Sequence, residues 1–274
     1  MFSSTVHLPS FIYLYNGAET ESLNLEEIAG YLERWFKQVK IELREDFFSY
    51  YLSHLPPEKK ETAVDELARK LAAIKVHQVN RNKSFVEPLD LEVEYERKKL
   101  LHGKVKSFGI LYDGFELLAL LSPLVPEEEL SLDHCHIIFT NQLFGTWSED
   151  DHRYHARVSV YGFPSLISTT GVVEAPAKPR DFYLKQQLGV SLLTLKEEFK
   201  GKFIDYNDPR LTEVMKGYVM QALFFHITGN PFCKNRNCRL YNAHWQEDLI
   251  QAQLTSKNDF CVQHQKILTR LAGR

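Results

Sequence analysis

Three of the four cysteines in the chain lie with a histidine in one short segment near its C-terminal end. Cys233 and Cys238 have four residues between them, and Cys261 and His264 have two. Thiolate and imidazole are the preferred ligands of structural zinc, which is commonly held by two closely spaced pairs. We call these four residues the cysteine clamp. Because four protein ligands fill the coordination shell and exclude water and substrate, the clamp is predicted to hold one structural zinc ion that stabilises the fold.

The segment "WQEDLIQAQL" lies between the two pairs and has the length of a short helix that folds the second pair back onto the first. The alternative is that the cysteines are free thiols in the core and the histidine is a surface residue. Four cysteines in 274 residues do not make a disulfide scaffold. In a reducing compartment, clustered cysteines are more often metal ligands than disulfides, which favours the zinc interpretation.

Other histidines offer further candidate sites. His134 and His136 flank Cys135 in "HCHIIF" and point to the opposite face of the predicted strand, where they form a possible ligand pair. Cys135 is interpreted as a small core residue. His244 and Glu247 are a further possibility, and we interpret them as support for the clamp or as solvent-exposed residues.

A dense polar run, "SEDDHRYHAR", precedes the C-terminal third of the chain. It contains Asp150, Asp151, His152, His155 and Arg157. Its two histidines are candidates to join His226 around a second metal ion. The alternative is that the run is a charged surface turn and that His226 is a hydrogen-bonded core residue on an apolar helix face.

The composition is that of an ordinary globular protein. With 274 residues, 44% of them hydrophobic, the chain can bury a large core, and we predict a single domain over residues 1–274. A formal charge of −3 gives no overall field to attract nucleic acid or an anionic membrane. No segment approaches the roughly 18 apolar residues of a membrane span, and the start of the chain lacks a basic signal region. A cytoplasmic protein without a membrane partner is therefore predicted.

The beginning of the chain alternates between strand and helix patterns. Strands are predicted over residues 11–15 and 39–43, with a helix over 25–36 between them that Asn24 caps. This strand, helix and strand predict an α/β fold in which helices flank the sheet. A charged amphipathic helix is predicted after Pro56 and Pro57.

Residues 79–129 have a looser pattern and are predicted to form an insertion or peripheral subdomain that contains a solvated helix over 91–101. "HIIFT" then predicts a strand that ends near Asn141. The segment 156–179 is predicted to be extended throughout, because it reads as strands that lead into the proline-containing "VVEAPAKP".

The most clearly delimited helix follows. Asp208 and Pro209 are typical of a helix start, and Gly229 followed by Pro231 is typical of a helix end. The apolar residues between them are predicted to form one buried stripe, on which His226 lies.

The order of helix, glycine turn and cysteine pairs resembles the archaemetzincins, a family of small zinc metallopeptidase-like proteins. In that family the active-site helix carries HExxHxxGxxH, runs into CxxxxC, and is followed by a CxxC that completes a structural zinc site. In "ALFFHITGNPFC", His226 matches the second histidine and Gly229 the glycine. The clamp matches the family's cysteine pairs, with His264 in place of the last cysteine. The resemblance covers the C-terminal quarter of the chain. It implies a metzincin-like mixed sheet with flanking helices, a helical insertion and a zinc-clamped segment over 230–274.

The resemblance breaks at the catalytic motif. Ala222, Leu223 and Phe232 stand where the family has the first histidine, the glutamate and the third histidine. A catalytic zinc needs about three protein ligands and a bound water, and peptide hydrolysis needs a general base. His226 alone remains as a remnant of the motif, and the methionine that follows the second family cysteine is replaced by Leu240. No catalytic residue is assigned, and whether the protein is an enzyme stays open at this point.

Three functions follow from these residues. The leading hypothesis is an inactive metallopeptidase homologue with a structural zinc and a cleft that binds a peptide or protein partner, with "VVEAPAKP" as a possible exposed edge. The second is an active zinc-dependent hydrolase with a relocated site at His152, His155 and His226. The third is a zinc module for nucleic acid, suggested by Lys234, Arg236 and Arg239 around the clamp but opposed by the acidic balance and the absence of interleaved aromatic residues.

Overall fold

The computed structural model describes residues 7–18, 20–81, 87–102 and 109–272. A five-stranded sheet forms its centre, in the order β2 (Lys40–Glu45), β1 (Phe11–Gly17), β4 (His134–Thr140), β8 (Ser165–Ser168) and β7 (Ser159–Val160). All neighbours in this sheet are parallel except β7 and β8. A second sheet has the order β3 (Leu111–Asp113), β5 (Leu143–Ser148) and β6 (Arg153–Arg157). The predicted α/β fold with a mixed sheet and flanking helices is confirmed.

The predicted strand, helix and strand at the start form a crossover in which helix α1 (Leu25–Trp35) connects the parallel neighbours β1 and β2. Asn24 caps this helix, since its side-chain Oδ1 accepts a hydrogen bond from the backbone N–H of Glu27 at 2.9 Å. β1 runs to Gly17, beyond the predicted end at Tyr15, because it is paired on both sides: Asn16 lies opposite Glu45 of β2 and Phe139 of β4.

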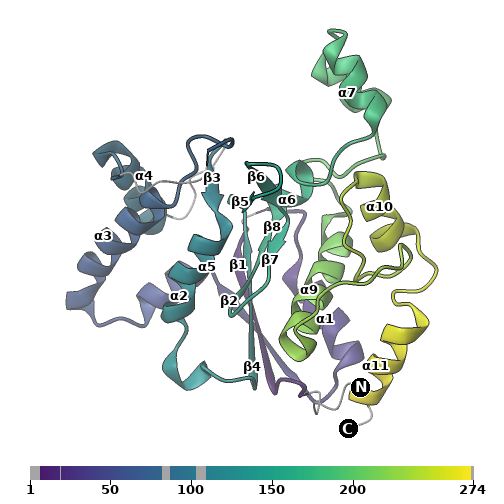
Figure 1. The fold of residues 1–274 in the computed structure, drawn as a ribbon. Helices are drawn as coiled ribbons and strands as arrows, with labels where there is room; N and C mark the ends of the chain where they lie inside the picture. Colours follow the sequence, from purple (N-terminus) through teal and green to yellow (C-terminus); the bar gives the residue numbers. More distant parts are fainter. Residues whose placement is uncertain (1–6, 19, 82–86, 103–108, 273–274) are drawn as a thin grey trace.

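Helices cover both faces of the central sheet (Figure 1). On one face α1, α9 (Leu211–Thr228) and α11 (Val262–Ala272) pack over a core to which β1 and β4 contribute Ile12, Leu14, Ile137 and Phe139. The other face carries α2 (Phe47–Ser53), α3 (Pro57–Ala73) and α5 (Gly114–Leu121), around Tyr15, Phe47, Leu71 and Leu117. Each face therefore has its own hydrophobic core, as the layered architecture requires.

Residues 79–129 contain α4 (Asp90–His102), β3, α5 and two 3-10 turns (Ser122–Leu124 and Glu127–Glu129). Residues 82–86 and 103–108 of this segment lie outside the described residues. α4 packs against α3, and Lys75 forms an ion pair of 2.8 Å with the fully buried Glu96. Tyr112 and Leu121 contribute to the second core. That the segment is an insertion into a single domain stays a prediction.

The prediction of an extended segment over 156–179 was right for β7 and β8 but wrong over residues 169–174. β8 is followed at once by helix α6 (Thr169–Glu174), and Ser168 caps it by accepting a hydrogen bond from the backbone N–H of Gly171 at 2.9 Å. The short β-branched run "TTGVV" is helical because α6 lies against the β6–β7 connection, where Val172 and Val173 are buried. The segment "VVEAPAKP" is therefore no free sheet edge; within the central sheet, β7 has that position.

Helix α9 differs from its prediction at one end and agrees at the other. It begins at Leu211, because Asp208 accepts a hydrogen bond from the backbone N–H of Arg210 at 2.9 Å and forms a turn before the helix. It ends at Gly229, whose φ of 71° is left-handed, as predicted. Nearly all of its residues from 211 to 224 are buried, so α9 has no single apolar stripe and runs through the interior.

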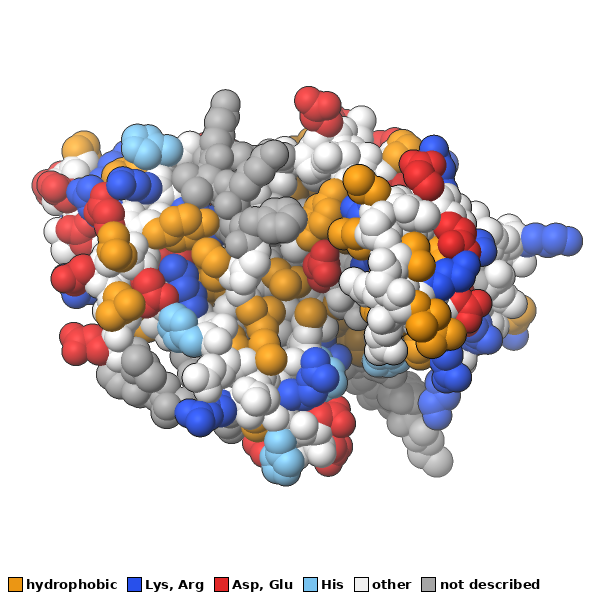
Figure 2. Space-filling view, turned by 90° about the horizontal axis from the view of Figure 1, so that it is seen from above, with side chains coloured by type: hydrophobic (Ala, Val, Ile, Leu, Met, Phe, Trp, Pro, Cys, Tyr) orange, Lys and Arg blue, Asp and Glu red, His pale blue; other side chains and the backbone are white. Residues whose placement is uncertain are grey.

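A helical hairpin of α7 (Arg180–Gln187) and α8 (Leu192–Glu198) is held by a small separate core of Phe182, Leu195, Phe199 and Phe203. In Figure 1 α7 extends away from the central layers. Charged side chains of both signs are interspersed over the face drawn in Figure 2. None of the described helices combines the length and the apolar character needed to cross a membrane.

Candidate metal centre and adjoining cleft

The cysteine clamp joins the end of α9 to the start of α11. Cys233 and Cys238 lie in the loop that follows α9, and this loop closes on itself because the backbone N–H of Cys233 donates to the carbonyl of Leu240 at 2.7 Å. Cys261 and His264 lie at the start of α11. The predicted spacer helix between the pairs is α10 (Gln246–Ile250), which continues as one π-helical turn over Gln251–Thr255.

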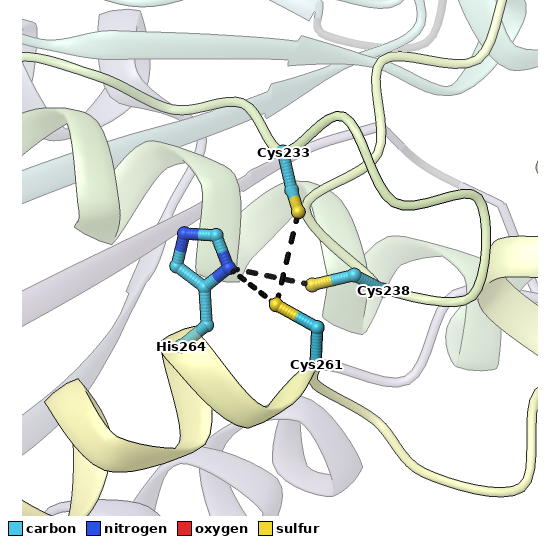
Figure 3. Close-up of side chains that lie close together, drawn as sticks. All are labelled: Cys233, Cys238, Cys261 and His264. Carbon is cyan, nitrogen blue, oxygen red and sulfur yellow. Dashed lines mark hydrogen bonds between the residues drawn. The ribbon is translucent and has the colours of Figure 1, made fainter.

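The four ligand atoms of the clamp converge on one point (Figure 3). The Sγ atoms of Cys233 and Cys261 are 3.9 Å apart, and Nδ1 of His264 is 3.1 Å from Sγ of Cys261 and 3.7 Å from that of Cys238. All four atoms lie within 4.8 Å of one another. With Zn–S bonds of about 2.3 Å, tetrahedral ligands stand about 3.8 Å apart, so the four residues fit a zinc ion.

The surroundings of the clamp suit a bound cation. The backbone N–H of Asn235 lies 3.3 Å from Sγ of Cys233, where it would stabilise a thiolate. Burial raises the pKa of the Cys238 thiol to about 12. A metal ion would reverse this preference, because zinc binds the thiolate and releases the proton. The Phe224 ring of α9 contacts the imidazole of His264 edge-on, with ring centroids 5.3 Å apart, and fixes its orientation.

The basic residues near the clamp are largely paired with carboxylates. Arg236 forms an ion pair with Asp248 of α10, and Arg239 forms ion pairs with Glu213 of α9 and with Asp259. Arg239 is buried. These pairs attach the clamp loop to α9 and α10, while the side chains of Lys234 and Arg236 remain exposed.

The remnant of the catalytic motif is not part of the clamp. Ala222 and Leu223 are fully buried in the core of the α9 face. His226 is half-buried, and its Nε2 lies 2.9 Å from the backbone carbonyl of Leu132. Burial lowers the pKa of His226. This matches the interpretation of His226 as a hydrogen-bonded histidine.

The polar run forms the turn between β5 and β6. His152 has a left-handed φ of 48°, and Nε2 of His155 contacts the carboxylate of Asp151 at 2.7 Å. Among the residues that the structure describes, the clamp residues are the one group of three or more potential metal ligands whose ligand atoms lie close together. His152, His155 and His226 are not part of this group. The backbone carbonyl of His244 accepts a hydrogen bond from the N–H of Ala177 at 2.8 Å. This bond joins the segment 231–244, which we call the clamp segment, to residue 177. Glu247 is exposed in the first turn of α10.

The candidate pair on β4 is bonded to β1 instead of converging on a metal site. Nδ1 of His134 lies 3.0 Å from the hydroxyl of Tyr13, and Nδ1 of His136 lies 3.0 Å from that of Tyr15. Cys135 is buried on the other face, as predicted. The two histidines therefore contribute to the packing of the sheet.

His136 makes folding stability depend on pH. Burial lowers its pKa from 6.5 to about 4, so the folded chain keeps the ring neutral while the unfolded chain protonates it below pH 6.5. The stability that the neutral His136 ring contributes is fully present above pH 6.5 and is lost as the pH falls toward 4. Between pH 7 and 5 the loss is about 2 kcal/mol, at about 1.4 kcal/mol per pKa unit.

Urea unfolding of wild type and His136→Gln at both pH values measures this effect. The free energy of unfolding should fall by about 2 kcal/mol more in wild type than in the variant between pH 7 and 5. Equal losses in the two proteins would show that His136 does not cause the pH dependence.

A cleft of about 420 Å³ lies beside the clamp. Its main walls are the end of β6 with β7, one face of α9 and the segment 231–244, and Phe115, Thr146, Ala175 and Pro176 complete the lining. The lining residues from α9 are Tyr218, Gln221 and Phe225, and those from the clamp segment are Pro231, Phe232, Tyr241, Asn242, Ala243 and His244. Sequence reasoning predicted a cleft but did not locate it, although Gln221 was a signal as an uncharged polar residue in an otherwise apolar stretch of helix.

Gln221 connects the cleft to the clamp. Its side-chain Nε2 donates to the backbone carbonyls of Arg239 and Tyr241, at 3.2 and 3.1 Å, and its Oε1 accepts from the hydroxyl of Tyr161 at 2.6 Å. Gln221 is itself buried. The position of the clamp segment therefore sets the position of one cleft wall.

Two solved structures are similar to the chain: archaemetzincin from Methanopyrus kandleri, at 12% identity and a TM-score of 0.44 over 100% of both chains, and a zinc-dependent peptidase from Methanocorpusculum labreanum, at 11% identity and a TM-score of 0.39 over 94% of this chain and 99% of that one. No curated protein matches the sequence. A family model described as "Probable metallopeptidase family (DUF6775)" matches residues 8–271, nearly the whole chain. The chain therefore belongs to this metallopeptidase family.

Proposed function

We propose that the protein is a catalytically inactive member of its family, which holds one structural zinc ion in the clamp and binds a peptide or protein segment in the adjoining cleft. The observation that carries this proposal is the chemistry of the cleft lining, in which the described residues include one histidine, His244, and no aspartate, glutamate or cysteine. A cleft with this lining is equipped to bind a chain but not to hydrolyse it.

The missing groups are those that the reaction needs. Zinc-dependent peptide hydrolysis uses about three protein ligands with an open coordination position, and a carboxylate that removes a proton from the bound water. The clamp has four ligand residues and so leaves no open position. Ala222 and Leu223, which replace the first histidine and the glutamate, are enclosed in the core and do not line the cleft.

The cleft has the features of a peptide site. β7 is an edge strand of the central sheet and lies in the cleft wall, so an extended peptide can add to it as a further strand. The aromatic rings of Tyr161, Phe225 and Phe232 provide apolar contacts beside this edge. We place the protein in the cytoplasm, where the free thiols of the clamp stay reduced for metal binding.

The test uses zinc-loaded protein and a broad pool of fluorescein-labelled short peptides. We expect members of the pool to bind, with dissociation constants of about 1–100 μM that are common for exposed peptide sites, and no peptide to be cleaved when the pool is analysed by mass spectrometry. Asn242→Trp should weaken binding at least tenfold, because Asn242 is exposed at the cleft wall and the larger indole obstructs the cleft.

Asn258→Trp is the matched control, since Asn258 is also exposed but does not line the cleft. Zinc-dependent cleavage, together with a second bound metal ion, would replace the proposal by the relocated hydrolase. Equal binding by both tryptophan variants would place the peptide elsewhere. A salt-sensitive gel shift with nucleic acid and no peptide binding would favour the third hypothesis.

A further inference from the structure

Arg157 contributes a cation to the wall of the cleft. It is the last residue of β6 and its side chain is half-buried. Its Nε–H donates to the hydroxyl of Thr146 on the neighbouring strand β5 at 2.8 Å. This bond anchors the guanidinium at its base, and Arg157 and Thr146 both line the cleft.

The backbone at Arg157 is closely held. A side chain at Gly171 of α6 would collide with the carbonyl oxygen of Arg157. The backbone N–H of Ser168 donates to the carbonyl of Val158 at 2.7 Å, which ties the next residue to the start of α6. The backbone of Arg157 is therefore fixed before a ligand binds, so binding costs little backbone conformational entropy at this residue.

The charge of Arg157 is not balanced within the cleft. It is the one formally charged residue among those that line the cleft, and no aspartate or glutamate that the structure describes forms an ion pair with it. Burial lowers the pKa of Arg157, and no neighbouring anion raises it again. An arginine side chain stays protonated in proteins, so this charge persists in the partly desolvated wall. Contact with an anion would offset that desolvation.

We propose that Arg157 determines the specificity of the cleft by binding a carboxylate of the peptide, from an aspartate or glutamate side chain or from the C-terminus. This inference rests on the proposed peptide-binding function. A carboxylate fits the two terminal guanidinium nitrogens, which remain beyond the Nε–H bond to Thr146. A phosphate group carries about two charges, and the lining supplies no second cation for it.

Four pools of fluorescein-labelled short peptides test the proposal. They are identical except that one fixed position is glutamate or glutamine and the C-terminus is a free acid or an amide. Wild type should bind one acid form at least tenfold more tightly than its neutral counterpart, as for a charged hydrogen-bonded pair. A preference for glutamate indicates a side-chain carboxylate, and a preference for the free acid indicates the C-terminus.

Arg157→Gln should abolish this preference and keep the affinity for the neutral pool, which also verifies that the variant is folded. Arg157→Lys should retain part of it, because the charge remains without the planar fork. Arg153→Gln is the matched control: Arg153 is an exposed arginine on the same strand that does not line the cleft, and its replacement should leave the preference unchanged.

The outcomes separate the two proposals. If wild type binds the pools but does not distinguish acid from neutral forms, or if Arg157→Gln keeps the preference, the role of Arg157 is overturned and the peptide function stands. If no pool binds, including the neutral one, the peptide function fails and the role of Arg157 fails with it.

Discussion

Replacing Cys238 by serine is expected to reduce the zinc content from about one ion per chain to nearly none, because the fourth ligand of a closed tetrahedral site is lost. Zinc binding contributes directly to folding free energy in such sites. The thermal midpoint should therefore fall by about 10 °C or more, at roughly 2–4 °C per kcal/mol for a domain of this size. Metal analysis and calorimetry on the same samples measure both effects, and a strong chelator should lower the midpoint of wild type similarly.

Cys135→Ala provides the matched control for this result. It also removes one buried thiol, but Cys135 lies in β4 and outside the clamp. The control should keep its zinc and lose only about 1–2 kcal/mol of stability from the small cavity. Wild type that contains no zinc, or Cys238→Ser with a full zinc content, would contradict the assignment of the clamp.

Leu223→Glu is expected to destabilise the protein by about 4 kcal/mol or more and to produce no peptidase activity. The substitution restores the glutamate of the HExxH motif at its aligned position, but Leu223 is fully buried in the core between α9 and the sheet. A carboxylate there has no partner, and an unpaired buried charge is among the most damaging single changes. Urea unfolding monitored by circular dichroism measures the loss.

Leu223→Met tests the same position without a charge. It conserves the volume approximately and should cost less than about 1.5 kcal/mol. If Leu223→Glu were as stable as Leu223→Met, position 223 would have access to water, and the proposed inactivity would need another explanation.

The clamp and the first crossover were predictable because their signals are local. Two pairs of soft ligands at short spacing indicate a metal site without knowledge of the fold, and Asn24 caps α1 through a contact three residues away. The glycine end of α9 is equally local, since Gly229 has the left-handed backbone that its type permits. Features of this kind are encoded within a few residues of one another.

The cleft and helix α6 were not predictable from local signals. The β-branched "TTGVV" favours a strand by propensity, and burial against the β6–β7 connection overrides that preference. The face of α9 that meets the cleft is set by distant partners: Gln221 bonds to Tyr161 on one side and to the clamp loop on the other. Because α9 is buried almost all round, its hydrophobic pattern does not reveal which face lines a cavity.

The bonds from Gln221 to the carbonyls of Arg239 and Tyr241 have a thermodynamic consequence for the two proposed sites. The same short loop carries two clamp cysteines and part of the cleft wall, so the proposed zinc and peptide sites share one structural element. If zinc holds this wall in its peptide-binding position and thereby raises peptide affinity by some factor, the bound peptide must raise zinc affinity by the same factor. In this arrangement an ion that takes no part in chemistry still acts as an effector, and cellular zinc supply would set how much of the protein is competent to bind its partner.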